Sequence, residues 1–268
     1  MTSIIYKLNA KLRRLRVFLT NFKLILVLSP AFMTYTYAML IHPATESNLD
    51  WNYIQGVWYD WQGLNVGILA LISSITLLYA AKHNEIKQSE RELKCAKAFM
   101  PEALSELCDY LKLATALVKE AHDDITITKS NHHELTNKPP VLPEKYRGVM
   151  ETCIKHGDNQ TTQDLSSLIH KIQVLNSRLS HIHKGFRLNS TTIFTSRTTL
   201  GLFMTTGEIQ SILNKAFSYA RSNTPILADE LTLSDYVEAY NNLEHGLSDI
   251  EGLTKFTLEY LEKRMQAK

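Results

Sequence analysis

The residues that could carry chemistry are histidines and carboxylates that lie far apart along the chain. His181 and His183 are separated by one residue, His132 and His133 are adjacent, and His170 lies between these pairs. Imidazole is a common zinc ligand, but zinc sites need further ligands at short, regular spacings. The carboxylates near these histidines show no such spacing, so ordinary surface or core histidines are the better interpretation. We therefore expect no metal site.

No nucleophile or acid–base pair stands out either. The chain has no glycine-rich phosphate loop, no Gly-x-Ser-x-Gly turn, no His-Glu-x-x-His and no Cys-x-x-Cys. Asp123 and Asp124 fit a solvated loop better than a catalytic pair. Cys95, Cys108 and Cys153 are odd in number and widely spaced, which favours free thiols over disulfides or metal ligands. We expect no catalytic residue, cofactor or small-molecule substrate, and no enzymatic activity.

The clearest element of the chain is an uncharged apolar segment, residues 64–81, which we interpret as a transmembrane helix. About 20 mainly apolar residues cross a hydrocarbon core that is about 30 Å thick. Trp61 precedes the segment and Lys82 closes it, as expected for residues at the two membrane interfaces. A buried helix in a soluble core is the alternative interpretation.

A second apolar run, residues 24–41, predicts another transmembrane helix. It follows six basic residues in the segment 1–23, and no acidic residue occurs before Glu46. A basic region before an apolar run also describes a signal peptide, but this run is longer than a signal core and lacks a small-residue cleavage site. Pro30 can kink the helix, which membrane helices tolerate.

Charge predicts the orientation of the two spans. The connection over residues 42–63 contains no lysine or arginine, whereas the outer flanks of both spans are basic. By the positive-inside rule, both termini are cytoplasmic and the connection is external.

The net charge of +2 is too close to neutral to indicate nucleic-acid binding.

Aromatic and basic residues mark the ends of the two predicted spans. The three tryptophans of the chain all lie in the connecting segment, and amphipathic rings of this kind favour the headgroup level. We expect this aromatic-rich loop to lie flat on the outer interface and to draw the spans into a tight hairpin. The predicted interfacial anchors are Trp51, Trp58, Trp61, Lys23 and Lys82.

One face of the second predicted span carries a line of small residues. Gly63, Gly67, Ala70 and Ser74 follow one another at steps of four, three and four. Such a line lets another helix approach closely, and that helix belongs either to the first span of the same chain or to a second copy of the protein. The spans carry no charge that would indicate a proton relay or a coupled transporter. Hydroxyls that could bond across helices or line a wet path belong to Thr34, Thr36, Ser73, Ser74 and Thr76.

Residues 82–268 are predicted to form a cytoplasmic α-helical domain. Apolar residues at steps of three and four predict helices from Pro101, over 161–184, over 206–221 and from Leu233 to Tyr260. Thr206 and either Thr232 or Ser234 are the expected caps, and Gly185 is an expected stop. Residues 123–157 predict a long loop with at most short helical pieces, and the β-branched residues of 186–206 indicate an extended stretch that is too irregular to be a sheet. The fold class we predict is an all-α membrane protein, with an N-terminal transmembrane hairpin followed by a helical bundle; a coiled coil between subunits would use the same apolar stripes.

Two stretches of the sequence resemble a known group of proteins. They are Trp61-Gln62-Gly63-Leu64-x-x-Gly67-x-x-Ala70-Leu71 and Ala96-Lys-Ala-Phe-Met-Pro101-Glu-Ala103-Leu104. This pattern is similar to the second span of small two-span membrane proteins from bacterial mobile and defence islands. Among them are the membrane effectors encoded beside retron reverse transcriptases. The similarity covers about forty of the 268 residues, and His83 to Gln88 stand where a glutamine-rich stretch is expected.

The resemblance implies an inner-membrane toxin of an anti-phage defence system. A retron reverse transcriptase with its attached RNA and DNA would hold the toxin inactive, and infection would release it to permeabilise or depolarise the membrane, causing abortive infection. Because two helices cannot enclose an aqueous lumen, several copies would have to assemble, or the bilayer itself would have to be deformed. The alternative is a non-enzymatic membrane sensor or scaffold subunit with a cytoplasmic helical interaction domain.

Overall fold

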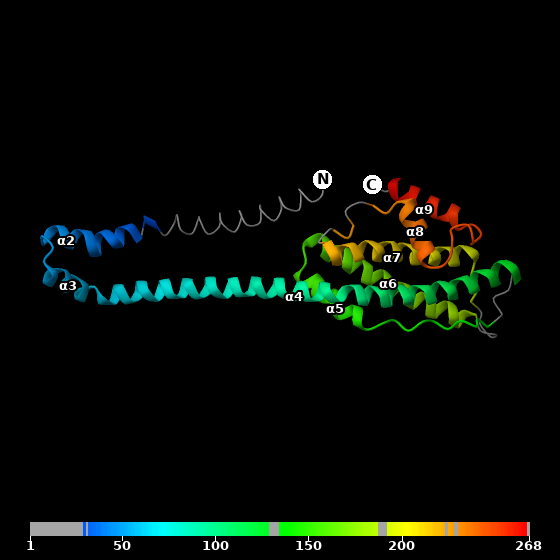
Figure 1. Ribbon diagram of the computed structural model, residues 1–268, viewed down its shortest axis with the longest axis horizontal. Helices are drawn as coiled ribbons and strands as arrows, with labels where there is room; N and C mark the ends of the chain where they lie inside the picture. Colours follow the sequence, from blue (N-terminus) through cyan, green and yellow to red (C-terminus); the bar gives the residue numbers. More distant parts are fainter. Residues whose placement is uncertain are drawn as a thin grey trace. The chain divides into compact units, whose positions relative to one another are not determined.

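The computed structural model describes residues 29–30, 32–128, 134–186, 192–222, 225–227 and 230–266. Every regular element in these ranges is helical, which confirms the all-α class (Figure 1). The chain divides into two compact units, residues 1–87 and 88–268. One helix, α4 (Gln62–Asp123), contributes residues to both units.

The first unit is described from residue 29 onward. Residues 29–30 and 32–36 are helical and lead into a π-helical turn, η1 (Tyr37–Ile41), and then into α2 (His42–Glu46). The predicted basic segment 1–23, and part of the predicted span 24–41, lie outside the described residues. The described remainder of that span is helical.

The connection between the predicted spans is not the loop that we expected. A ten-residue helix, α3 (Trp51–Asp60), occupies about half of it. Asp50 begins this helix, because its carboxylate accepts a hydrogen bond from the Asn52 N–H at 3.1 Å. Asn48 and Leu49, with φ of 51° and 68°, make the turn between α2 and α3. The sequence prediction used the tryptophans of this segment as interfacial residues and did not use Asp50 as a helix cap.

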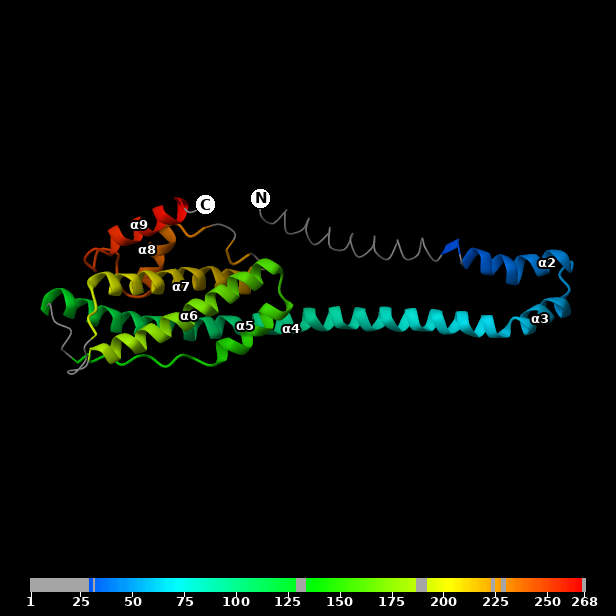
Figure 2. The same ribbon diagram turned by 180° about the vertical axis from the view of Figure 1, so that it is seen from behind.

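The second unit is a helical bundle. The C-terminal half of α4, α6 (Asn159–Gly185) and α7 (Ser196–Ser222) lie side by side in both views (Figures 1 and 2). α5 (Lys145–His156) packs on α6, and α8 (Leu233–Asn242) and α9 (Leu253–Gln266) pack on α7. Fully buried residues such as Leu111, Leu175, Phe203 and Tyr240 form one continuous core.

Two of the predicted helix ends are confirmed. The predicted helix over 161–184 is α6, which ends at Gly185, and the Phe194 ring occupies the space where a side chain at residue 185 would lie. Thr232 begins α8 through a reciprocal capping box with Asp235. These are local interactions, so the sequence alone could specify them.

The prediction of a long loop over residues 123–157 was wrong at both ends, although the described residues 134–144 between them are not helical. α4 continues through Asp123 into a π-helical turn, η2 (Asp124–Thr128), and α5 supplies twelve further helical residues. The buried face of α5 consists of Tyr146, Met150 and Cys153. A stripe this short, preceded by three prolines within five residues, does not dominate the sequence pattern.

The start of α7 was also placed wrongly. The helix begins at Ser196, so Thr206 is buried inside it rather than capping it. Threonine hydroxyls in this segment bond to carbonyls of their own helix: Thr199 donates to Ser196 O at 2.8 Å, and Thr206 donates to Phe203 O at 2.8 Å. Tertiary packing thus overrides the β-branched preference that had suggested an extended stretch.

The last predicted helix, from Leu233 to Tyr260, is two helices. Residues 243–252 separate α8 from α9, and Glu244 and Gly252 adopt φ of 64° and 81°. Left-handed residues end a helix, but the apolar spacing resumes beyond them and hides the break. Pro101, by contrast, lies inside α4 and neither begins nor ends a helix.

The glycines of α7 give a direct test of the packing between α7 and α8. A Cβ at Gly207 would lie 2.7 Å from ring atoms of Tyr240, whereas a Cβ at Gly201 would have no neighbour within 4 Å. We expect Gly207→Ala to lower the free energy of unfolding by about 1–3 kcal/mol. Gly201→Ala should raise it by up to about 1 kcal/mol. Denaturant unfolding of both variants measures this, and similar effects of the two would contradict the close contact.

A buried histidine makes the second unit sensitive to acid. His122, on α4, is 2% exposed; its Nδ1 lies 2.8 Å from Thr199 Oγ1, and its ring packs edge-on against Phe203. Burial lowers the pKa of His122, although the carboxylates of Asp123 and Glu251 act in the opposite direction. The folded state therefore binds a proton at this ring less readily than the unfolded state does.

The consequence is a loss of stability as the pH falls. The pKa of a histidine in an unfolded chain is about 6.5. Below that pH the unfolded state binds a proton that the folded state binds less readily, so the free energy of unfolding falls as the pH is lowered. His122→Asn keeps a polar group within reach of Thr199 but cannot titrate. We expect this variant to lose less stability between about pH 7 and about pH 5 than the unmodified chain, in denaturant unfolding at the two values. His170→Asn, at an exposed position of α6, should retain the full loss.

Candidate functional site

The described residues contain one helix segment that is long and apolar enough to cross a membrane, and it lies in α4. No residue of its most apolar 18-residue window is buried. Leu69, Leu77 and Leu78, for example, are 64–72% exposed. Exposed apolar surface of this extent is unfavourable in water, and burial in lipid removes that cost.

A tryptophan of α3 completes the hydrogen bonding of the helix that precedes it. Pro43 has no N–H, so the carbonyl of Met39, four residues earlier, lacks its usual donor. The indole Nε1 of Trp58 donates to that carbonyl at 2.9 Å. Next to this position the helix widens into η1, where the N–H of His42 donates to Tyr37 O. Trp58 is thus a structural donor as well as an aromatic residue of the connecting segment.

Asn65 provides a second polar link in the first unit. The Tyr35 hydroxyl donates to Asn65 Oδ1 at 2.7 Å, and Asn65 Nδ2 donates to the Trp58 carbonyl at 3.3 Å. Asn65 is half-buried, whereas Leu64 and Val66 on either side are exposed. Polar side chains that bond across helices stabilise helix packing in apolar surroundings. The sequence prediction passed over Asn65 because a single amide inside an apolar segment has no recognisable spacing.

The line of small residues is uncovered in the described structure. Gly63, Gly67, Ala70 and Ser74 are all exposed on α4. A Cβ at Gly63 or Gly67 would meet no atom of the described residues within 4 Å. The described part of the first predicted span contacts α4 at Asn65 instead, through the Tyr35 hydroxyl. An assembly role for this line stays a prediction.

Four of the five serine and threonine hydroxyls named for the predicted spans are bonded within their own helices. Each donates at 2.8 Å to the carbonyl four residues earlier, the donors being Thr34, Thr36, Ser74 and Thr76. This pattern satisfies the hydroxyls without a neighbouring helix. The arrangement therefore leaves these groups uninvolved in contacts between helices.

The predicted interfacial anchors fall into two groups. Trp51 and Trp61 are 64% and 54% exposed, and Lys82 is exposed on α4. Trp58 is partly exposed but is fixed by its bond to the Met39 carbonyl. Lys23 lies outside the described residues. The anchor roles of the exposed members stay predictions.

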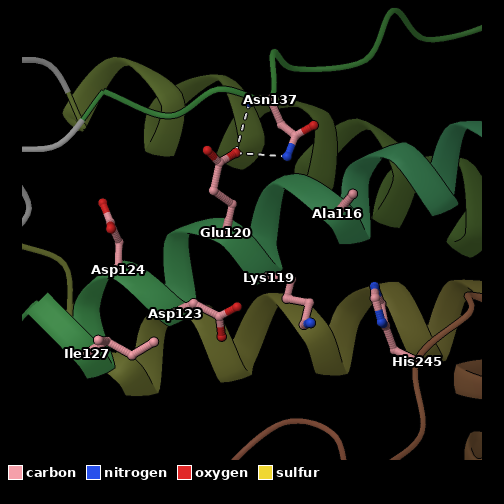
Figure 3. Close-up of a pocket in the computed structure, with 8 residues that line it drawn as sticks. All are labelled: Ala116, Lys119, Glu120, Asp123, Asp124, Ile127, Asn137 and His245. Atoms are coloured by element: carbon pink, nitrogen blue, oxygen red, sulfur yellow. Dashed lines mark hydrogen bonds between the residues drawn. The ribbon is translucent and has the colours of Figure 1, made fainter.

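A surface cavity of about 550 Å³ lies beside the C-terminal end of α4 (Figure 3). The Glu120 carboxylate accepts hydrogen bonds from the backbone N–H groups of Thr136 and Asn137 at 2.6 and 2.8 Å. Burial alone would raise the pKa of Glu120, but these hydrogen bonds outweigh it and hold the pKa below its usual value. Across the cavity, burial and the nearby Lys119 charge lower the pKa of His245. The Glu120 carboxylate therefore holds the chain after η2 in place and is not free to act in the cavity.

No group of histidine, cysteine, aspartate and glutamate side chains is arranged to hold a metal ion among the residues that the structure describes. His181 contacts the Phe194 ring edge-on at 5.5 Å between centroids. His132 and His133 lie outside the described residues. The prediction of free thiols is confirmed, and burial raises the pKa of the Cys153 thiol to about 11, which disfavours the reactive thiolate.

A serine, a histidine and a glutamate form a chain of contacts between α4 and α5. Ser89 Oγ lies 2.9 Å from His156 Nδ1, and His156 Nε2 lies 2.7 Å from Glu92 Oε2. These residue types can form a nucleophilic triad. Ser89, however, lies inside a helix whose backbone N–H groups are bonded internally and cannot stabilise an oxyanion. The contact therefore fixes α5 to α4, and sequence reasoning missed it because its partners are 67 residues apart.

The bond from Trp58 to Met39 can be tested by a conservative substitution. Trp58→Phe keeps an aromatic ring but removes the donor, which leaves the Met39 carbonyl unpaired. We expect the contact between the helical residues 32–41 and α4 to loosen. Spin labels on cysteines introduced at the exposed positions Met33 and Leu69, in a chain without its native cysteines, should show a broader distance distribution. Trp61→Phe removes an exposed indole instead and should leave the distribution unchanged; a broadening of the same size would show that the bond is unimportant.

No protein-family model, no curated protein and no solved structure matches this chain. The features that bear on function are therefore the exposed stretch of α4, the contacts around it and the sequence resemblance of residues 61–104.

Proposed function

We propose that this protein is a membrane effector of a bacterial, retron-type anti-phage defence system, which permeabilises or depolarises the inner membrane on infection. The observation that supports the membrane part is the uncharged stretch of α4, in which no residue of the most apolar window is buried. The resemblance of residues 61–104 supplies the class of system. In this proposal residues 24–41 and 64–81 span the bilayer, both termini are cytoplasmic, and the protein is not an enzyme.

Permeabilisation requires more than one copy of the chain. Two helices leave no ring around which an aqueous lumen could form, so several copies must assemble or deform the bilayer. The open space at Gly63 and Gly67 supports their line as the assembly surface, since another backbone can approach there without displacing a side chain. The hydroxyl of Ser74 is already bonded to Ala70 O, so close packing rather than hydrogen bonding would drive this contact.

The bundle is the proposed regulatory part. α4 carries the exposed stretch and also buries Leu104, Leu107 and Leu111 in the bundle core. A partner that binds the bundle can therefore act on the helix that enters the membrane. We propose that this partner is the retron reverse transcriptase with its RNA and DNA, and that infection disturbs the complex.

A scaffold subunit of a membrane complex is the second candidate. The connecting segment supports a scaffold over a sensor of external ligands, because it consists largely of two helices with few buried residues, Pro43 and Ile54 among them. Expression of the chain alone and with its genomic neighbours separates the candidates. An effector slows growth and admits an impermeant dye when its restraining partner is absent, whereas a scaffold does neither.

The assembly surface gives the sharper test. Gly67→Leu keeps α4 apolar but holds a neighbouring helix away by the width of a side chain. We expect this variant to insert normally and to lose both higher-order crosslinks and dye entry. Leu78→Ile, at a position that is 72% exposed on the same helix, should lose neither. Dye entry through Gly67→Leu at the unmodified rate would show that this face is not the assembly surface.

A further inference from the structure

α9 covers a polar part of the bundle interior. It packs on α7 and α8, and among its described side chains Leu253 and Thr257 are fully buried. Phe256, Tyr260 and Leu261 are partly buried. α7, in contrast, has fourteen buried residues along its length. The apolar contact that holds α9 is therefore small compared with the contact that holds its neighbour.

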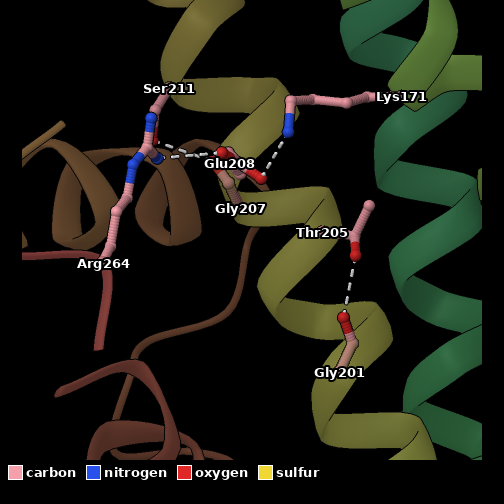
Figure 4. Close-up of polar contacts among 7 residues, drawn as sticks. All are labelled: Lys171, Gly201, Thr205, Gly207, Glu208, Ser211 and Arg264. Atoms are coloured by element: carbon pink, nitrogen blue, oxygen red, sulfur yellow. Dashed lines mark hydrogen bonds and ion pairs between the residues drawn. The ribbon is translucent and has the colours of Figure 1, made fainter. Parts of the chain in front are cut away.

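An ion pair fixes the far end of α9. The Glu208 carboxylate, on α7, is 6% exposed and lies between two cations that approach from opposite sides (Figure 4). Arg264 Nη1, in the last turn of α9, lies 3.1 Å from Glu208 Oε1, and Lys171 Nζ, on α6, lies 3.1 Å from Glu208 Oε2. A buried carboxylate without a counter-charge is strongly unfavourable. Because Lys171 remains in place, Arg264 can leave without exposing Glu208 to that cost.

Hydroxyl groups beneath α9 lack good partners. Among the residues that the structure describes, the buried Tyr236 hydroxyl has no hydrogen-bond partner, and the Tyr240 and Thr257 hydroxyls lie next to each other without a well-formed hydrogen bond. Buried polar groups that are left unpaired carry a desolvation cost. Water would satisfy these groups if α9 moved away, so the closed arrangement is less favourable than an apolar contact of the same area.

The chain before α9 has the form of a hinge. Gly252, with φ of 81°, immediately precedes the helix, a conformation that side chains rarely adopt. The start of the connection is held separately, because Lys112 Nζ on α4 lies 2.9 Å from Glu244 Oε1. Motion about Gly252 can therefore move α9 without moving α8.

We propose that α9 is a latch that opens about Gly252 while α4 to α8 stay folded, and that the Arg264–Glu208 ion pair holds it closed. Opening uncovers Glu208, Tyr236 and Tyr240, an acidic and hydroxyl-bearing surface on α7 and α8. The latch is a property of the second unit and does not depend on the proposed membrane activity.

Amide hydrogen exchange of the full chain in detergent, read by mass spectrometry, tests the latch. Amides of α9 should exchange at least roughly tenfold faster than those of α7, because local opening is less costly than global unfolding. Arg264→Gln should speed exchange in α9 by roughly a further tenfold and leave α6 and α7 unchanged. Arg264→Lys should restore part of the protection. Lys263→Gln removes the same charge from an exposed neighbour in the same turn and should change nothing.

Three results would overturn the latch. α9 could exchange as slowly as α7 in the unmodified chain, which would make it an integral part of the bundle. Arg264→Gln could accelerate α7 and α9 equally, which would mean that the ion pair supports the whole fold. Lys263→Gln could match Arg264→Gln, which would mean that general charge and not the Glu208 contact sets the protection of α9.

Discussion

α4 must satisfy two different surroundings along one helix. Between residues 64 and 81 its side chains are uncharged and mostly exposed on every face, whereas between residues 96 and 122 its buried residues recur every three or four positions. The hydrophobic effect stabilises the second part through the bundle core, and it stabilises the first part when lipid covers it. The bundle helices attach to the amphipathic part by specific contacts, such as Tyr110 with Asn176 on α6 and His122 with Thr199 on α7.

Backbone and side-chain hydrogen bonding explains much of the remaining arrangement. In the first unit, Pro43 frees the Met39 carbonyl and the Trp58 indole takes the vacant place, so one missing N–H decides how α3 lies on the preceding helix. In the second unit, Glu208 is satisfied from two sides, but the Tyr236 hydroxyl is not satisfied. Hydrogen bonds to buried groups fix the position of an element, whereas a buried polar group without a partner carries a cost in free energy.

Residue types that could do chemistry are present, yet their surroundings assign them structural roles. Ser89, His156 and Glu92 lie at contact distances, but the serine lies inside α4, where the backbone N–H groups are bonded within the helix. Glu120 lines a cavity, but its oxygens are taken by backbone N–H groups. The proposals therefore concern three surfaces. They are the exposed stretch of α4, its small-residue line, and the surface beneath α9 that includes Glu208, Tyr236 and Tyr240.

Features that depend on neighbours along the chain could be predicted from the amino-acid sequence. The uncharged stretch 64–81, the extent of α6 and the cap at Thr232 follow from composition, periodicity and local hydrogen bonding, and the structure has helices in all three places. Only the tertiary structure decided the start of α7, the break between α8 and α9, and the partners of Trp58, Asn65 and Glu208. Each of these depends on a group far away in sequence, and a periodic pattern reports which face is apolar but not which group lies against it.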